Sequence, residues 1–381
     1  MRLRHRMAVK RHYLRSRIAD VCVSKINRNT AKREFFMAKS KSYYAAANTA
    51  NGFLSLFGEI FSPAALSRIY IIKGGPGTGK STFMYGIGKA AKERGLETEY
   101  YYCSADTGSL DGVKIPLLGV AVIDGTSPHA QEPRYPGACE KIINLGENFD
   151  CEKLRMNRAE IEKLSDECSA CYKRGVRFLS AAGETERLRL ELAARSFDAE
   201  KARKAARRIL AKAKPAHGEY AERYISALGT RGEAHIYNPL SKDEKAVCVT
   251  GKYGAERLFL SVLCEEARKA GYTVLRFPDV LLHDCTEGLY IKELRARFTS
   301  VAEGEEELNA MRFVRQDVLA ESRGKLRFAE KCREALLQGA LAELAKMGKT
   351  HDELEKYYIA AMDFCKSDAL REELEKEIFG E

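Results

Sequence analysis

The residues with the clearest chemical potential form a glycine-rich run in the first quarter of the chain. The run reads Gly74-Gly75-Pro76-Gly77-Thr78-Gly79-Lys80-Ser81, is followed by Thr82, and fits the pattern G-x-x-x-x-G-K-[ST]. Glycines allow the backbone to turn tightly and to aim successive N–H groups at phosphate oxygens. We expect Lys80 to reach the β- and γ-phosphates of a nucleotide and Ser81 to ligate Mg²⁺ through its hydroxyl.

The elements around this run suit phosphate binding. Residues 68–72 form a short apolar, β-branched stretch that predicts a buried strand. Residues 80–94 predict a helix, and Gly95 stands where a C-cap is expected. The run would therefore lie between a strand and the N-terminus of a helix, where the helix dipole favours an anion.

A second signal is the apolar stretch 117–124, which predicts a strand ending in Asp124. A carboxylate at the end of a strand beside the first one can hold Mg²⁺ through water. The alternative is an aspartate that opens a turn with Gly125. Because Gly125 follows directly, an Asp-Glu pair is missing, and the base that activates water must come from elsewhere.

The segment 103–112 follows a strand predicted over 97–103. Ligands bind outside the carboxyl ends of strands in doubly wound sheets, so Asp106 and Asp111 are candidates to orient an attacking water or an acceptor hydroxyl. The alternative is that both only form turns in a Gly/Ser-rich loop. His129 and Arg134 could donate to a γ-phosphate, or could be ordinary loop residues.

Part of this sequence resembles a known family. The resemblance rests on the runs Ser109-Leu110-Asp111-Gly112-Val113, Val120-Ala121-Val122-Ile123-Asp124-Gly125-Thr126, Pro136-Gly137-Ala138 and Ile142-Ile143-Asn144-Leu145-Gly146-Glu147, and on the late segment His351-Asp352-Glu353-Leu354-Glu355-Lys356-Tyr357-Tyr358. They are similar to an uncharacterised family of bacterial tandem P-loop ATPases, described as nucleotide-kinase-like NTPases. The similarity runs from about Lys39 to the C-terminus. It implies ATP binding and supplies no reaction.

The tandem design can be tested inside the chain, because a shift of 176 residues superimposes the two halves without a gap. It places Gly75 on Gly251 and Phe83 on Phe259, and it predicts a second strand (245–250), helix (256–270) and strand (272–277).

The residues expected to bind phosphate and Mg²⁺ are not repeated at the shifted positions. Lys80 falls on Glu256 and Ser81 on Arg257. A glutamate repels phosphate, so the second copy is expected to be degenerate, in contrast to a family pattern with two intact loops. The alternative is that Lys252 or Arg257 reaches the first site and stabilises charge there.

The remaining segments predict long, charged helices. Residues 151–230 carry a buried stripe at helical spacing, and residues 303–381 are again helical. Residues 201–214 hold seven basic residues and no acid, which favours a solvated helix, with an RNA-contacting strip as the alternative. The expected domains are a basic extension (1–36), a nucleotide-binding core (39–150), a helical insertion or lid (151–230), a degenerate second domain (231–302) and a C-terminal helical region (303–381).

Composition limits the class of protein. The 381 residues carry a formal net charge of +10, and residues 1–36 supply +9 of it, so the body is nearly neutral. The codons for Arg-Glu-Phe-Phe before Met37 can form a ribosome-binding site with a spacer, so we expect translation to start at Met37. The alternatives are that residues 1–36 are a basic arm or a transit peptide. Apolar runs of roughly 20 residues, which could span a bilayer, are missing. Eleven scattered cysteines favour a cytoplasmic protein with reduced thiols.

The sequence therefore predicts an α/β protein with a doubly wound parallel sheet of the P-loop NTPase class, duplicated in tandem, with helical additions. The expected function is Mg²⁺-dependent ATP binding with hydrolysis or transfer of the terminal phosphoryl group. The alternatives are a small-molecule or nucleotide kinase, and a nucleotide-gated regulatory protein with little turnover. An unknown acceptor or protein partner is expected, a nucleic-acid partner is not favoured, and no membrane contact is expected.

Overall fold

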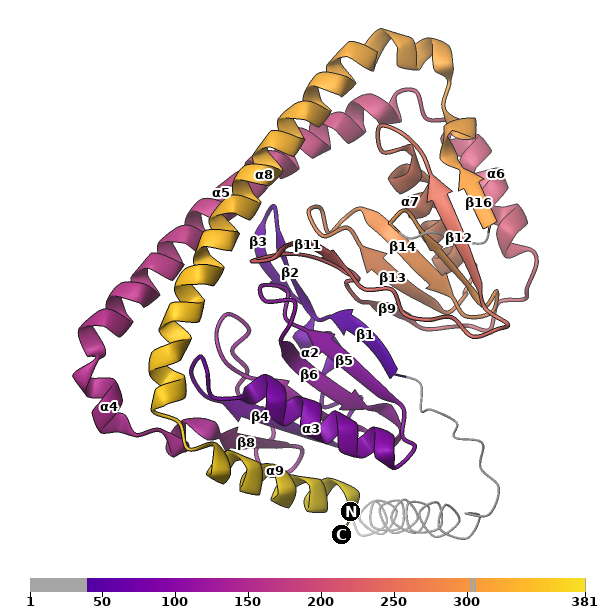
Figure 1. Ribbon diagram of the computed structural model, residues 1–381. Coiled ribbons are helices and arrows are strands. Elements are labelled where there is room, and N and C mark those ends of the chain that lie inside the picture. The colour runs from indigo at the N-terminus through magenta and orange to yellow at the C-terminus, as the bar shows by residue number, and fades with distance from the viewer. Residues whose placement is uncertain (1–39, 302–303, 305, 381) are drawn as a thin grey trace. The chain divides into compact units, whose positions relative to one another are not determined.

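The computed structural model describes residues 40–301, 304 and 306–380, so the predictions for residues 1–36 lie outside the described part. Residues 40–381 form one unit, drawn in Figure 1. It is an α/β structure with two six-stranded mixed sheets of mostly parallel strands. Among the described residues, no helix combines the length and the apolar character needed to cross a membrane.

The first sheet has the strand order β1-β5-β6-β7-β4-β8. Its strands are β1 (Ser40–Tyr44), β4 (Arg68–Lys73), β5 (Thr98–Tyr102), β6 (Leu110–Ile115), β7 (Val120–Asp124) and β8 (Glu140–Asn144). β4 lies between β7 and β8 and is parallel to both. β6 is antiparallel to β5 and to β7, so the prediction of a parallel, doubly wound sheet is wrong here. The connections on both sides of β6 are too short for the crossover that parallel neighbours require.

The second sheet repeats this arrangement. Read from its other edge, its order is β9-β13-β14-β15-β12-β16. Its strands are β9 (Tyr220–Glu222), β12 (Lys245–Thr250), β13 (Val274–Pro278), β14 (Thr286–Ile291), β15 (Ala296–Thr299) and β16 (Glu306–Asn309). Again the third strand in this order, β14, is antiparallel to its two neighbours. The sheet takes its first strand from residues that precede the domain boundary predicted at 231.

Shorter elements repeat as well. Each half has a hairpin after its first strand, β2 (Ala46–Thr49) with β3 (Gly52–Ser55), and β10 (Ser226–Gly229) with β11 (Gly232–His235). Helix α3 (Lys80–Glu93) follows β4, and α7 (Ala255–Lys269) follows β12, close to the predicted bounds. The first half also contains α2 (Phe57–Ile60), and 3₁₀ turns occupy Pro116–Leu118, Leu145–Asn148 and Ala310–Phe313.

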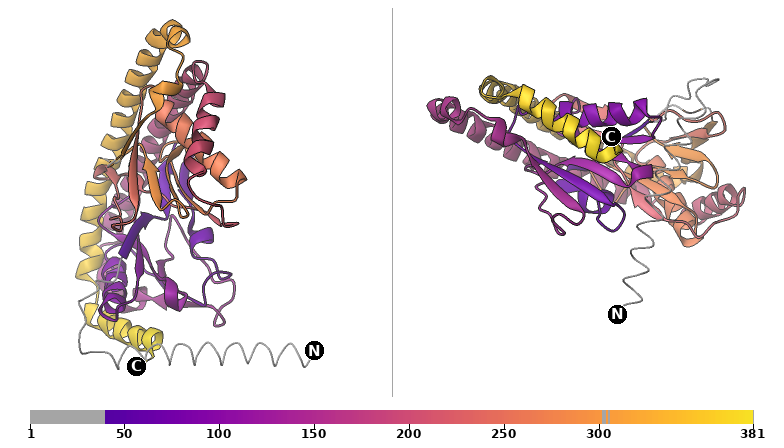
Figure 2. Two further views of the ribbon diagram at one scale, coloured as in Figure 1. Left: turned by 90° about the vertical axis from the view of Figure 1, so that its right-hand side faces the viewer. Right: turned by 90° about the horizontal axis from the view of Figure 1, so that it is seen from below.

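The helical additions are dominated by two long antiparallel helices, α5 (Arg158–Ala194) and α8 (Gln316–Ala360). The short helix α4 (Cys151–Met156) precedes α5. Arg174 pairs with Glu343, and Gly175 approaches Leu344, so the two helices pack closely over much of their length (Figure 2).

Each long helix leads into a terminal helix that packs on the other half. α6 (Ala199–Leu210) follows α5 but packs against α7, with Ala202, Ala206 and Leu210 in the core of the second half. α9 (Phe364–Phe379) follows α8 but packs against α3, with Leu374 in the core of the first half. The two halves thus exchange their last helices.

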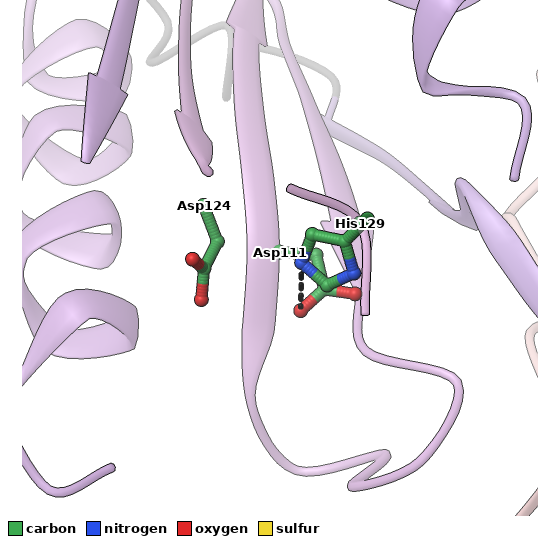
Figure 3. A group of neighbouring side chains, drawn as sticks. All are labelled: Asp111, Asp124 and His129. Atoms are coloured by element: carbon green, nitrogen blue, oxygen red, sulfur yellow. Dashed lines mark ion pairs between the residues drawn. The ribbon is translucent and has the colours of Figure 1, made fainter. Parts of the chain in front are cut away.

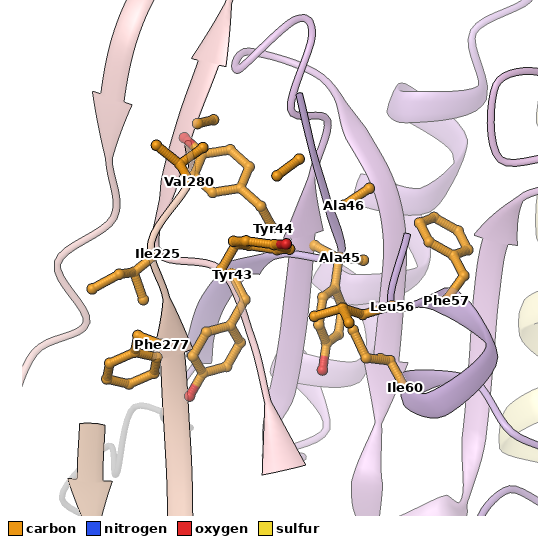
Figure 4. Packing of buried hydrophobic residues seen from close by; sticks show 14 of the residues in the cluster. Tyr43, Tyr44, Ala45, Ala46, Leu56, Phe57, Ile60, Ile225, Phe277 and Val280 are labelled. Atoms are coloured by element: carbon orange, nitrogen blue, oxygen red, sulfur yellow. The ribbon is translucent and has the colours of Figure 1, made fainter. Parts of the chain in front are cut away.

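A third core joins the halves directly. It includes Tyr43 and Tyr44 of β1 and Ile225, Phe277 and Val280 of the second half (Figure 4). The backbones of Tyr44 and Tyr224 exchange two hydrogen bonds, of 2.9 and 3.2 Å. The halves are therefore parts of one packed body.

Candidate functional site

The glycine-rich run forms the connection between β4 and α3, as predicted. Gly77 and Gly79 have positive φ angles of 66° and 79°, a left-handed conformation that glycine adopts without strain. The Thr78 hydroxyl donates to the carbonyl of Gly75 at 2.9 Å and closes the loop on itself. Thr78 is buried, whereas Thr82 is exposed on the first turn of the helix.

Lys80 is the first residue of α3, and its ammonium group turns back over the loop. Nζ donates to the carbonyls of Gly74 and Gly75 at 3.1 and 2.9 Å. The same Nζ lies 3.6 Å from Oδ2 of Asp124. Asp124 ends β7 and pairs with Ile72 in the parallel ladder, so the sheet itself brings the acid to the lysine.

Ser81 contacts the strand beyond β7. Its Oγ accepts a hydrogen bond of 2.9 Å from the backbone N–H of Leu110, the residue before Asp111. Two backbone elements that are distant in sequence, the loop and the start of β6, are thereby tied together beside Asp124.

Asp111, Asp124 and His129 form a buried group (Figure 3). Their potential ligand atoms all lie within 4.8 Å of one another, and His129 Nε2 lies 3.8 Å from Oδ1 of Asp111. Asp124 Oδ1 accepts from the N–H and the hydroxyl of Thr126, at 2.8 and 2.6 Å. The ring of His129 stacks on Phe57 at a centroid distance of 4.6 Å.

Burial sets the protonation of this group. It raises the pKa of Asp111 to about 8, with the nearby charge of Asp124 adding to the effect. Burial also lowers the pKa of His129, which favours a neutral imidazole. The pKa of the Cys103 thiol rises well above its usual value, first through burial and then through the charge of Asp111.

Two predicted residues lie outside this group. Asp106 accepts from the Ser109 hydroxyl at 2.6 Å and pairs with Arg231 at 3.1 Å, so it organises its own turn and contacts the second half. Arg134 is exposed, and its backbone N–H donates to Glu140. Of the two loop aspartates, only Asp111 lies beside Asp124.

The end of α8 lies against the glycine-rich loop, a contact that was not expected from the sequence. The N–H of Gly77 donates to Oε1 of Glu355 at 3.2 Å. A Cβ on Gly77 would come within 2.9 Å of Ile359 and 3.1 Å of the carbonyl of Glu355, and a Cβ on Gly75 within 3.4 Å of Tyr358. The segment 351–358 entered only through the resemblance, and no local signal links it to a loop 278 residues away.

The second copy has a different loop. β12 ends at Thr250 and α7 starts at Ala255, so its connection is shorter than the one between Lys73 and Lys80, and the gapless shift of 176 residues is wrong at this point. Its left-handed residues are Tyr253 and Gly254.

Arg257 does not reach the first loop. It pairs with Glu186 and, at 2.9 Å, with Asp279, and both partners are buried. Glu186 also pairs with Arg189 and, at 3.5 Å, with Arg333. A network of buried ion pairs thus occupies this end of the second sheet.

Comparisons with known proteins give no assignment. No family model, no curated protein and no solved structure matches the chain. The chemistry of the site therefore follows from the residues and the geometry described above.

Proposed function

We propose that the chain binds Mg-ATP at the loop 74–81 and hydrolyses it or transfers its terminal phosphoryl group. The observation that carries the proposal is the pairing of Lys80 with Asp124 at 3.6 Å, from the helix after β4 and the end of the adjacent parallel strand. A cationic side chain on a glycine loop, with an acid on the neighbouring strand, is the arrangement that holds phosphates and Mg²⁺ together.

The loop also has the chemistry of an anion site. The N–H of Gly77 points at a carboxylate oxygen of Glu355, at a distance of 3.2 Å. This oxygen stands in for the phosphate oxygen to which such an amide donates in a nucleotide complex. The residues therefore fit the ligand that is proposed.

The roles of the side chains follow from their positions. Lys80 and the loop amides would hold the charge of the terminal phosphates, and Ser81 and Asp124 would hold Mg²⁺, which withdraws electron density from the phosphate oxygens. Asp111 is a buried carboxyl group beside Asp124, with its pKa raised to about 8, and in its ionised form it could take a proton from water or an acceptor hydroxyl. Asp106 is left with a structural role.

The repeated strand order supports a P-loop NTPase architecture duplicated in tandem, with a degenerate second copy. In the second copy the shorter loop and the ion pairs of Arg257 replace the phosphate-binding groups. A cytoplasmic location belongs to the same proposal, and free thiols such as those of Cys171 and Cys264 are in keeping with it.

The test is Mg²⁺-dependent release of ADP from ATP by the full chain, compared with Lys80→Ala. Removing one cationic stabiliser of developing phosphate charge is expected to lower turnover roughly 100-fold or more. Lys89→Ala is the matched control, because Lys89 lies on the same helix, 79% exposed, and pairs only at 3.9 Å with Glu93. Equal turnover in wild type and Lys80→Ala, with both folded, would refute the assignment.

A nucleotide-gated regulatory protein is the second candidate, and the end of α8 favours it. Glu355 and Ile359 lie against the loop, so a nucleotide that displaces them would move a helix that runs to the other half. Limited proteolysis with and without a slowly hydrolysed ATP analogue tests this function. Changed cleavage near 355–363, in a protein with little turnover, would support it.

A further inference from the structure

His129 has an unusual environment for a histidine with no assigned partner. It is 6% exposed, and neither ring nitrogen has a hydrogen-bond partner among the residues that the structure describes. Its ring stacks on Phe57, at a centroid distance of 4.6 Å, and on Phe53, at 6.1 Å. A buried polar group without a partner costs about 1–3 kcal/mol, so the fold holds this imidazole in place at a cost.

The two carboxyl groups beside His129 are also buried. Asp111 is 4% and Asp124 is 7% exposed. Thr126 holds Oδ1 of Asp124 through two hydrogen bonds, and Oδ2 lies 3.6 Å from the ammonium group of Lys80. Figure 3 shows both carboxyl groups and the imidazole near one another, contributed by the start of β6, the end of β7 and the loop after it.

The spacing fits a shared cation better than a direct contact. His129 Nε2 and Asp111 Oδ1 are 3.8 Å apart, which is too long for a hydrogen bond. Two atoms that ligate the same ion, each at about 2.1 Å, lie roughly 3–4 Å from one another. All three groups offer a ligand atom within 4.8 Å of the others, so a small closure of the group would complete such a site.

We propose that Asp111, Asp124 and His129 bind a divalent first-row transition metal. Carboxylates alone would suit Mg²⁺, but an imidazole nitrogen favours ions such as Mn²⁺, Fe²⁺, Co²⁺ and Zn²⁺. With three protein ligands the ion keeps open positions for water or another ligand. The Thr126 contacts to Asp124 and the stacking of His129 on Phe57 supply the support that orients metal ligands.

This site shares Asp124 with the proposed Mg²⁺ site but does not require a nucleotide. In the described structure the ammonium group of Lys80 lies 3.6 Å from Asp124, and the metal would replace that contact. The second group with metal-ligand chemistry in the described part is His351, Asp352 and Glu355, which is partly exposed and lies on α8. His351 therefore offers a matched control.

The experiment uses the full chain without nucleotide and titrates Co²⁺ by its visible absorption and Mn²⁺ by electron paramagnetic resonance. We expect one ion per chain, nitrogen hyperfine coupling to Mn²⁺ from one imidazole, and displacement by Mg²⁺ only at much higher concentration. His129→Gln should weaken Co²⁺ binding at least tenfold and abolish the nitrogen coupling, whereas His351→Gln should change neither. Asp111→Asn gives a second variant if His129→Gln does not fold.

Three results would overturn the proposal: no Co²⁺ or Mn²⁺ binding by the folded wild type, unchanged binding in both site variants, or equal affinity for Mg²⁺. ATP binding is measured separately on the wild type, with Lys80→Ala as the variant that should not bind. If the wild type binds the metal but not ATP, the metal site is supported and the proposed function is refuted. If it binds ATP but not the metal, the proposed function is supported and the metal site is refuted.

Discussion

Replacing Glu355 by glutamine is expected to tighten ATP binding by the full chain. The carboxylate of Glu355 accepts the hydrogen bond of the Gly77 N–H at 3.2 Å, an amide that the phosphates of a nucleotide would need. His351 Nδ1, at 4.0 Å, is the other polar group facing this carboxylate. A bound nucleotide must therefore displace Glu355 and then tolerate its negative charge nearby.

The size of the effect follows from two contributions. Repulsion between the carboxylate and phosphate charge a few ångströms away is about 1 kcal/mol in a partly solvated site. A neutral amide oxygen accepts the same hydrogen bond more weakly, by about 0.5 kcal/mol at this exposure. Together these give roughly tenfold tighter binding of ATP to Glu355→Gln.

The assay is calorimetric or fluorescence titration of ATP at fixed Mg²⁺ and salt. Glu353→Gln is the matched control, because Glu353 carries the same charge on the same helix and is exposed. Unchanged or weaker ATP binding in Glu355→Gln, with normal binding in the wild type, would refute competition between the carboxylate and the nucleotide.

Three stability predictions rest on buried groups. Burial, and then the charge of Asp279, raise the pKa of Glu287 from 4.5 to about 8, so the folded state holds a proton that the unfolded state releases. Stability should therefore fall as pH rises from about 5 to about 8. Glu287→Gln should raise the melting temperature at pH 8.5 far more than at pH 5, and equal gains would contradict this. Glu186 is fully buried among arginines, so Glu186→Gln should lower the free energy of unfolding by about 3 kcal/mol in denaturant titrations, unlike the exposed Glu184→Gln. A Cβ on Gly183 would lie 2.2 Å from that of Ala50, so Gly183→Ala should cost about 1–3 kcal/mol by the same measurement, and a neutral result would show that α5 shifts freely.

The local elements could be predicted from the sequence because their signals are local. The strand at 68–73 and the helix at 80–93 follow from apolar runs and from the glycines between them. The same holds for the second strand and helix, at 245–250 and 255–269. The pairing of β4 with β7 could also be predicted, because an apolar strand that ends in Asp124 is expected beside the strand before the loop.

The strand β6 and the shorter second loop were missed for different reasons. Leu110–Ile115 contains Asp111, Gly112 and Lys114, so no apolar run marks it as a strand, and Asp111 was expected in a loop. The short connections on both sides of this strand then require it to run antiparallel. The shift of 176 residues matches the strands Leu110–Ile115 and Thr286–Ile291 and so hides the shorter loop between Thr250 and Ala255.

The contacts that complete the site are long-range and could not be inferred from spacing. Glu355 reaches Gly77 only because α5 and α8 pack antiparallel and return the chain to the first half. His129 was named as a phosphate donor, but its burial against Phe57 depends on the position of the helix at 57–60. Asp106 and Asp111 look alike in sequence, and tertiary burial alone separates them.

The exchange of terminal helices has a consequence for how the chain acquires its fold on the ribosome. The first sheet receives Leu374 into its core, and the Tyr70 hydroxyl and the Lys141 ammonium both reach Glu377, near the end of the chain. The half that is synthesised first therefore stays incomplete until α9 has emerged. Since α6 packs on the second half, no earlier segment within residues 40–301 takes the place of α9 on α3. Maturation of the first half is in this way tied to the synthesis of α9, and a chain that stops before α9 would expose the apolar face of α3.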